Sequence, residues 1–226
     1  MSNPIVRFLG AAGLTGVVAC VTLSAASFPG PAVDENRSQK KTETVVLAGG
    51  CFWGVEAVFD DLKGVSDAVA GYAGGSKSSA HYEIVSTGTT GHAESVQVTF
   101  DPSVVSFGQL LKIYFSVAHD PTELNHQGAD EGTQYRSEIF YTSDEQKRIA
   151  DAYIQQLIDG KVFRHRIVTK VAPLQAFYRA EDYHQDYVLH CRQNLPVCTN
   201  KPYVVYNDLP KLTNLRATYP ELVKGD

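Results

Sequence analysis

The sequence has almost no methionine. Met1, the initiator, is its one methionine among 226 residues. Methionine fills irregular gaps in protein cores, and its thioether is readily oxidised to a polar sulfoxide. The interior of this chain therefore offers no such target to an oxidant. Genomic bias would leave the same absence, so the count alone identifies no function.

The sequence also lacks clustered positive charge. Lysine and arginine occur singly along the chain, and the formal net charge is -5. A nucleic-acid-binding protein is expected to carry a basic patch or stripe, so this class is excluded. With 43% hydrophobic and 20% charged residues, the composition is that of an ordinary globular protein with a sizeable core. We find no internal repeat and no second domain, and we expect a monomer.

The N-terminal region differs from the rest of the chain. Residues 1–26 combine a short start carrying one positive charge with a long uncharged apolar run, and Ser24-Ala25-Ala26 supplies small residues for cleavage. This pattern is typical of a signal peptide, and the polar residues 27–42 that follow predict a disordered linker. We expect an exported, periplasmic or otherwise extracytoplasmic protein. An uncleaved anchor and lipidation at Cys20 are the alternatives.

A single cysteine lies between a predicted strand and a predicted helix. Residues 44–48 are apolar and β-branched, and Gly49-Gly50 end that strand directly before Cys51. Residues 55–62 have the pattern of a helix, so Cys51 is expected at its first turn. The unpaired N–H groups and the dipole at that point favour a thiolate. Phe52 and Trp53 provide an apolar wall beside the sulfur. A cysteine that simply packs in the core is the alternative.

The rest of residues 43–226 predicts one α+β domain. We expect a two-layer sandwich of a mixed sheet with flanking helices, a ferredoxin-like-related core, long loops and an irregular C-terminal tail. The predicted strands are residues 64–72, 93–100, 135–141 and 166–171, with a short extended piece at 81–86. The predicted helices begin after Ser106 and Ser143, and Gly160 ends the second of them.

One carboxylate falls on the apolar face of a predicted strand. In residues 93–100 the period of two places Glu94 on the same face as Val96, Val98 and Phe100. A buried carboxylate must be paired or have a raised pKa. A protonated carboxyl group beside a thiol has the properties of a general acid. A solvent-facing Glu94 at the frayed strand start is the alternative.

The long polar loop after His119 contains several acids but no metal-binding pattern. Its acidic residues and histidines match none of the usual zinc spacings, and no helix presents two ligands at i and i+4. We therefore predict no metal and no cofactor. The loop is instead expected to form a rim from which Asp130 and Tyr135 point toward Cys51.

Three cysteines remain after removal of the predicted leader: Cys51, Cys191 and Cys198. An odd number in an exported protein leaves one thiol free or exchanging. Cys191 and Cys198 lie in a tail interrupted by prolines, flexible enough to approach Cys51. They either form a structural disulfide or reduce an oxidised Cys51 through a disulfide relay.

Four blocks of the sequence together resemble one enzyme family. They are Gly-Cys-Phe-Trp-Gly at 50–54, Thr-Gly-Thr-Thr-Gly-His-Ala-Glu at 87–94, Asp-Glu-Gly-Thr-Gln-Tyr-Arg-Ser at 130–137 and Tyr-His-Gln-Asp-Tyr at 183–187. In this order they resemble the peptide-methionine (S)-S-oxide reductases, the A-type methionine sulfoxide reductases. The resemblance covers roughly residues 44–187, nearly all of the predicted domain.

The resemblance implies a role for each matched residue. Cys51 would attack the sulfoxide sulfur and become a sulfenic acid, and Glu94 would protonate the sulfoxide oxygen. Tyr82 and Tyr135 would donate hydrogen bonds to that oxygen within a network that Asp130 holds. The substrate-binding residues would be Phe52 and Trp53, which contact the methyl group of methionine sulfoxide, free or in proteins. Thioredoxin or a thioredoxin-like protein would be the reductant, and no cofactor is needed.

The tail departs from the pattern of many relatives. Residues 190–198 contain no glycine, and neither tail cysteine has the familiar spacing. We expect Cys198 to be the resolving cysteine, with Cys191 as a relay or as the alternative resolver.

Two other functions compete with sulfoxide reduction. A papain-like cysteine hydrolase also places a cysteine and a tryptophan at a helix start, and His184 would then be its base. The other is a non-catalytic thiol protein that binds partners through a mixed disulfide.

Overall fold

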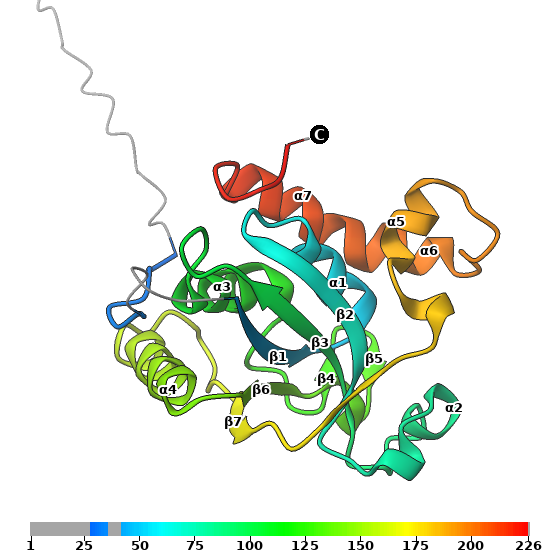
Figure 1. Ribbon diagram of the computed structural model, residues 1–226, viewed down its shortest axis with the longest axis horizontal. Helices are drawn as coiled ribbons and strands as arrows, with labels where there is room; N and C mark the ends of the chain where they lie inside the picture. The colour runs from blue at the N-terminus through cyan, green and yellow to red at the C-terminus, as the bar shows by residue number, and fades with distance from the viewer. Residues whose placement is uncertain (1–27, 36–41, 226) are drawn as a thin grey trace, which may run out of the picture.

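A computed structural model describes residues 28–35 and 42–225 of the chain (Figure 1). The predicted leader at residues 1–26 lies outside these residues. Part of the predicted linker, residues 28–35, lies against helices of the domain. The Tyr153 hydroxyl donates to the Pro29 carbonyl oxygen at 2.6 Å, and Phe28 contacts Phe163 edge to face. The domain boundaries stay a prediction.

A six-stranded mixed sheet organises the domain, in the order β7-β6-β1-β3-β2-β8. All neighbouring strands are antiparallel except β6 and β7, which are parallel. A separate pair, β4 and β5, lies in the long polar loop. The strands are β1 (Glu43–Gly49), β2 (Val65–Ala73), β3 (Ala93–Phe100), β4 (His126–Gln127), β5 (Asp130–Glu131), β6 (Ser137–Tyr141), β7 (Lys170–Pro173) and β8 (Phe177–Arg179).

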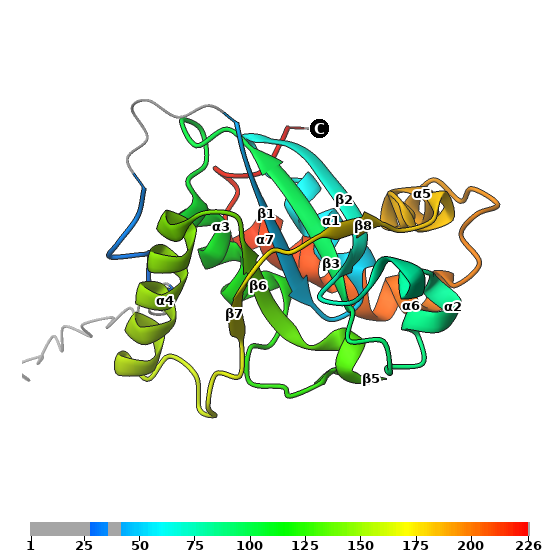
Figure 2. The same ribbon diagram turned by 60° about the horizontal axis from the view of Figure 1, so that its bottom comes forward.

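Helices pack around this sheet. In Figure 2, α1 and α7 lie behind the central strands, and α3 and α4 lie at the β6 side. The helices are α1 (Phe52–Asp60), α2 (Tyr82–Val85), α3 (Phe107–Ile113), α4 (Asp144–Asp159), α5 (Tyr187–Arg192), α6 (Lys201–Tyr203) and α7 (Leu209–Thr218). Two π-helical turns, Tyr114–Ala118 and Val204–Asp208, continue α3 and precede α7. No helix in the described part of the chain is long and apolar enough to cross a membrane.

The alternation of β1 divides the core between the two sheet faces. Val45 and Leu47 point into the large cluster formed with α1, α3, α4 and α7. Val46 and Ala48 point to a smaller cluster on the other face, against which Leu174 and Phe177 pack. Because side chains alternate along a strand, a strand covered on both faces is apolar throughout, as β1 is. The predicted α+β fold with a mixed sheet is confirmed.

The predicted helix starts are confirmed in atomic detail. The Ser106 hydroxyl accepts from the Gln109 N–H at 3.2 Å, and the Gln109 side chain accepts from the Ser106 N–H, which makes a capping box. Ser143 likewise accepts from the Gln146 N–H. Gly160 is the C-terminal cap of α4.

Three predicted elements differ in the structure. The extended piece at 81–86 is the short helix α2, because local bonds such as Val85 N–H to the His81 carbonyl oxygen form instead of a ladder. The last core strand begins only at Lys170 rather than at residue 166. The C-terminal tail is more regular than predicted, since α7 packs Leu212 and Leu215 into the core.

Candidate active site

Cys51 is the N-cap residue of α1, as predicted from its sequence context. Gly50 before it has φ +91°, a left-handed conformation that glycine adopts without strain. A Cβ atom at Gly50 would lie 2.7 Å from the Gln127 side chain. The glycine thus allows the chain to turn from β1 into α1 directly beneath the polar loop. Cys51 itself is only 9% exposed.

Glu94 lies on the buried face of β3, next to the first turn of α1. Its Oε2 accepts a hydrogen bond from the Phe52 backbone N–H at 3.2 Å, and the residue is 2% exposed. Burial raises its pKa to about 8, with the charge of Asp130 adding to the effect and the Phe52 N–H opposing it. The prediction of a buried, protonated acid beside the cysteine is therefore supported by the geometry.

One cavity brings all the predicted substrate and acid–base residues together. Seven of these residues line the cavity, and they come from four separate parts of the sequence. Two residues of the C-terminal tail line it as well. The lining consists of Cys51, Phe52, Trp53, Tyr82, Glu94, Asp130, Tyr135, Asn200 and Tyr203. Burial raises the pKa of Tyr82 to about 12 and also raises that of Tyr135, so both phenols keep their protons and can donate hydrogen bonds.

The aromatic wall is held in place from behind. The indole of Trp53 stacks on Tyr187 with ring centroids 3.8 Å apart and planes at 13°. Its Nε1–H donates to Nδ1 of His184 at 3.0 Å. Burial lowers the pKa of His184 to about 4, so the imidazole is neutral at pH 7 and Nδ1 accepts the bond. Trp53 therefore has a fixed orientation beside the cysteine.

The tail completes the cavity with residues that the sequence did not reveal. Tyr203 contacts the Trp53 ring edge to face, and its hydroxyl donates to Asp130 Oδ2. Tyr187 connects the tail to the wall, because its hydroxyl accepts from the backbone N–H groups of Thr199 and Asn200 at 3.0 and 2.8 Å. No regular spacing links Asn200 or Tyr203 to the earlier motifs, so only the fold identifies them.

The expectation that Cys51 is a ready thiolate is wrong for this state of the protein. Burial raises the pKa of the thiol well above its usual range, and the charges of Glu94 and Asp208 add to that effect. The Trp53 N–H, at the start of the helix, donates to the sulfur and lowers the pKa, but less strongly. Removal from water thus outweighs the helix N-terminus.

Known proteins of similar sequence belong to the family that the residues of this site resemble. The sequence profile of the family described as peptide methionine sulfoxide reductase matches residues 43–211. The chain belongs to the peptide methionine sulfoxide reductase family. The resemblance and the reductase activity predicted from the sequence are thereby confirmed.

Individual relatives of the family match over most of their length. A peptide methionine sulfoxide reductase MsrA 2 from Mesorhizobium japonicum is 54% identical over 188 residues, which are 83% of this chain and 93% of that protein. Another from Synechocystis is 50% identical over 200 residues, 87% of this chain and 90% of that protein. The reduced form of Mxr1 from Saccharomyces cerevisiae is similar in structure, with a TM-score of 0.61 and 35% identity over 70% of this chain and 91% of that one.

Family membership removes the cysteine hydrolase as an explanation of Cys51. In that alternative, His184 would act as the base of the thiol. In the structure its Nδ1 accepts the Trp53 indole N–H, and its ring lies 4.4 Å from the ring of Tyr82 and 5.0 Å from that of Phe52, measured between centroids. His184 therefore supports the aromatic wall of this reductase.

The two tail cysteines form a disulfide with each other, and Cys51 is free. The pairing is compatible with both predictions for the tail. It is a structural bond, or it is the state that a disulfide relay reaches after it has returned Cys51 to the thiol. The assignment of Cys198 as resolver stays a prediction.

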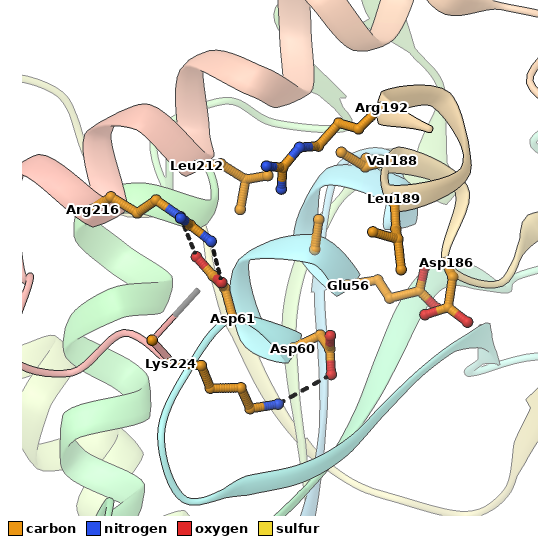
Figure 3. Close-up of a pocket in the computed structure, with 12 residues that line it drawn as sticks. Glu56, Asp60, Asp61, Asp186, Val188, Leu189, Arg192, Leu212, Arg216 and Lys224 are labelled. Atoms are coloured by element: carbon orange, nitrogen blue, oxygen red, sulfur yellow. Dashed lines mark hydrogen bonds and ion pairs between the residues drawn. The ribbon is translucent and has the colours of Figure 1, made fainter. Parts of the chain in front are cut away.

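The structure contains a second polar cavity at the opposite end of α1 (Figure 3). Asp61 pairs with Arg216 at 2.8 Å, and Asp60 pairs with Lys224 at 3.4 Å. Glu56 points toward Asp186 there, and its Oε1 accepts from the Ala70 N–H. These contacts connect α1 to β2 and to the C-terminal region. Within residues 28–35 and 42–225 no group of His, Cys, Asp and Glu is arranged to hold a metal ion.

Proposed function

We propose that the protein reduces the S epimer of methionine sulfoxide, free or within proteins, with Cys51 as the nucleophile and Glu94 as the proton donor. The observation that carries this proposal is the single cavity in which a thiol, a buried protonated acid, two phenols and an aromatic wall meet. Three of the four sequence blocks supply the thiol, the acid, the aromatic wall and Tyr135, and Tyr82 comes from the short helix α2.

The first step transfers the sulfoxide oxygen to Cys51. The Cys51 sulfur attacks the sulfoxide sulfur while Glu94 gives its proton to the oxygen. The S–O bond of the substrate then breaks, the hydroxyl group moves to the Cys51 sulfur, and the proton of the thiol returns to Glu94. The products are methionine and a Cys51 sulfenic acid, so that the thiol is oxidised by two electrons and the sulfoxide is reduced by two.

The surroundings of Glu94 suit this role. Because its pKa is about 8, most of Glu94 is protonated at neutral pH and adds no negative charge beside the thiol. Tyr82 and Tyr135 keep their protons and donate to the oxygen as negative charge develops there. Hydrogen bonds in a water-poor cavity stabilise such charge more strongly than they do in water.

The aromatic wall determines how the substrate lies. Phe52 and Trp53 face the cavity on the side of the thiol, where they would contact the methyl group of the sulfoxide. The polar groups Glu94, Tyr82 and Tyr135 would then face the oxygen. A site with one apolar and one polar side distinguishes the two epimers of a methyl sulfoxide, because exchanging methyl and oxygen places each against the wrong surface.

The tail cysteines then regenerate Cys51. The Cys198 thiol attacks the sulfenic acid, which forms a Cys51–Cys198 disulfide and releases water. The Cys191 thiol attacks Cys198, which frees the Cys51 thiol and leaves the Cys191–Cys198 disulfide that the structure contains. A dithiol protein of the thioredoxin type then reduces this bond and becomes oxidised itself.

Replacement of Cys198 by serine tests the relay. We expect one methionine per protein molecule, followed by loss of cycling with thioredoxin, because the sulfenic acid is no longer resolved. Product per active site is measured by rapid quench and chromatography. Cys191→Ser is the matched control and should stop at the Cys51–Cys198 disulfide, which non-reducing mass spectrometry identifies. Normal cycling of Cys198→Ser would transfer the resolving role to Cys191.

We propose that the protein functions outside the cytoplasm, in the periplasm or a comparable compartment. The apolar run at residues 8–26 supports export, and the disulfide of the tail is compatible with an oxidising compartment. Cytoplasmic thioredoxin does not reach that compartment, so the reductant would be a membrane-linked thioredoxin-like protein. Retention of the leader or lipidation at Cys20 are the alternatives, and the mass of the mature N-terminal peptide distinguishes them.

The function is tested by offering each epimer of methionine sulfoxide separately with a dithiol reductant. We expect reductant-dependent methionine formation from the S epimer and at least a hundredfold slower conversion of the R epimer, on the order of the penalty for unpaired polar groups in a site. Conversion of neither epimer by protein with a reduced, alkylatable Cys51 would refute the proposed function.

A further inference from the structure

Asp208 is the most unusual acidic residue outside the proposed catalytic set. It is 0% exposed, and among the described residues neither of its carboxyl oxygens has a hydrogen-bond partner. It ends the π-helical turn Val204–Asp208 and directly precedes α7. Burying a carboxyl group without a partner destabilises a protein, so its presence in this place requires an explanation.

The carboxyl group of Asp208 lies against the first turn of the catalytic helix. A Cβ atom at Gly54 would be 2.3 Å from Asp208 Oδ1 and 3.2 Å from Lys211 Nζ. Only a residue without a side chain fits at that position of α1. The last glycine of the Gly-Cys-Phe-Trp-Gly block therefore makes room for the C-terminal tail.

Residues near Asp208 in sequence also border a cavity that Cys51 lines. Asn207 and Lys211 line a third cavity, separate from that of Figure 3, which has Cys51 and His119 in its wall. Tyr203 and Asp130 border both cavities, and the hydrogen bond between them lies where the two meet. Asp208 is thus flanked in sequence by a residue that borders the same cavity as Cys51, and its carboxyl group lies against Gly54, three residues after Cys51.

The ionisation of Asp208 and that of Cys51 are coupled. Burial raises the pKa of Asp208 to about 7, with the charge of Lys211 opposing the shift and that of Asp130 adding to it. The charge of Asp208 in turn raises the pKa of the Cys51 thiol. A second negative charge in a poorly solvated place is disfavoured, so an ionised Asp208 makes ionisation of the Cys51 thiol harder.

We propose that Asp208 is a positioning residue of the reaction, a second buried acid which the tail supplies and which sets how readily Cys51 ionises. This inference rests on the proposed function in one respect, that Cys51 is the reacting thiol. Since Asp208 belongs to the same tail as Cys191 and Cys198, the ionisation of Cys51 depends on whether the tail is in place. The charged and titratable groups around this pair are Glu94, Asp120, Glu123, Asp130, Tyr82, Tyr135, Tyr203, His119 and Lys211.

Asp208→Asn tests the proposal through the pH dependence of Cys51 alkylation. In protein with the Cys191–Cys198 disulfide intact, iodoacetamide modification of the Cys51 peptide is followed by mass spectrometry from pH 5 to pH 10. Removing the negative charge should move the midpoint of the profile to lower pH. The rate at pH 7 should rise roughly threefold to tenfold, a change of half to one pH unit. Asp208→Leu, which also removes the charge at similar size, should give the same displacement.

Val204→Ala is the matched control, since Val204 is buried in the same π-helical turn and carries no charge. If Val204→Ala only loosens the tail, the alkylation rate of Cys51 should rise by the same factor at every pH. The midpoint of the pH profile should then stay unchanged. An unchanged midpoint in Asp208→Asn and Asp208→Leu, or only a uniform rise like that of Val204→Ala, would overturn the proposal. Because alkylation needs no sulfoxide, the shift is measured even if the protein were to reduce neither epimer.

Discussion

Replacement of Cys51 by serine is expected to abolish reduction of methionine sulfoxide, with a loss of kcat/KM of roughly 10⁴-fold or more. The sulfur of Cys51 receives the oxygen atom and is oxidised in doing so, whereas the oxygen of serine has no comparable oxidation state. A hydroxyl group is also a far weaker nucleophile than a thiol. Methionine formation with excess dithiol is the measurement, with the S epimer well below its KM so that the rate gives kcat/KM.

The serine variant should otherwise be intact. Cys51 is small and lies at the N-cap, a position that serine prefers, so the free energy of unfolding should be little changed or higher. The Cys191–Cys198 disulfide and the fluorescence of Trp53, the single tryptophan of the chain, should match those of the parent. Activity within tenfold of the parent in the folded variant would exclude Cys51 as the nucleophile.

Replacement of Glu94 by glutamine is expected to slow the chemical step about 10²-fold to 10⁴-fold, the usual contribution of a general acid. The amide is nearly isosteric and still accepts from the Phe52 N–H, so the cavity should keep its shape. It has no proton to give to the sulfoxide oxygen. The rate is measured as methionine formed in a single turnover, because regeneration of Cys51 then does not contribute.

The contribution of Glu94 to the rate should decrease as the pH rises. Glu94 acts when protonated, and its pKa is about 8, so its contribution should be complete well below pH 8 and lost as the pH rises through that value. Ionisation of Cys51 changes the rate in both proteins. Glu94→Gln also removes the charge that raises the pKa of Cys51, so the thiol of the variant should ionise at lower pH. Both effects lower the ratio of the parent rate to the Glu94→Gln rate as the pH rises, and we expect that ratio to fall through about pH 8.

Two results would contradict this role of Glu94. Equal single-turnover rates in the two proteins would remove Glu94 from the mechanism. A rate ratio that stays constant from pH 6 to pH 10 would show that Glu94 acts by shape or by hydrogen bonding and not by giving a proton. Tyr135→Phe is a useful companion variant, since it removes a hydrogen-bond donor from the same cavity without removing an acid.

The sequence was sufficient to predict the parts of the site that depend on local pattern. A β-branched apolar run, a glycine pair and an amphipathic stretch placed Cys51 at the start of a helix, which is its position in the structure. The period of two in residues 93–100 placed Glu94 on the buried face of β3. Both inferences depend on short continuous stretches, residues 44–62 and 93–100, over which backbone geometry follows directly from the order of side chains.

The contribution of the tail could not be predicted in this way. Tyr203 reaches Asp130, and Asp208 reaches Gly54, across long separations in sequence that no periodicity connects. These contacts exist because α7 packs Leu212 and Leu215 into the core and so holds the preceding turn against α1. Tertiary packing of that kind is the result of the whole fold.

The protonation state of Cys51 could not be predicted from a local sequence pattern either. The helix start is a local feature that favours a thiolate, and it was visible in the sequence. The burial that raises the pKa of the thiol comes from the sheet, the polar loop and the tail together. A local pattern therefore predicts where a reactive group lies better than it predicts the charge of that group, which depends on every neighbour.

The most direct test of the central claim uses the double variant Cys191→Ser/Cys198→Ser, in which Cys51 has no partner in the tail. The protein is mixed with the S epimer of methionine sulfoxide in the absence of reductant. Methionine and the mass of the Cys51 peptide are measured at the same time points. We predict one methionine per protein molecule and the gain of one oxygen atom on Cys51 at the same rate. Methionine formed while Cys51 stays unmodified would contradict oxygen transfer to this cysteine.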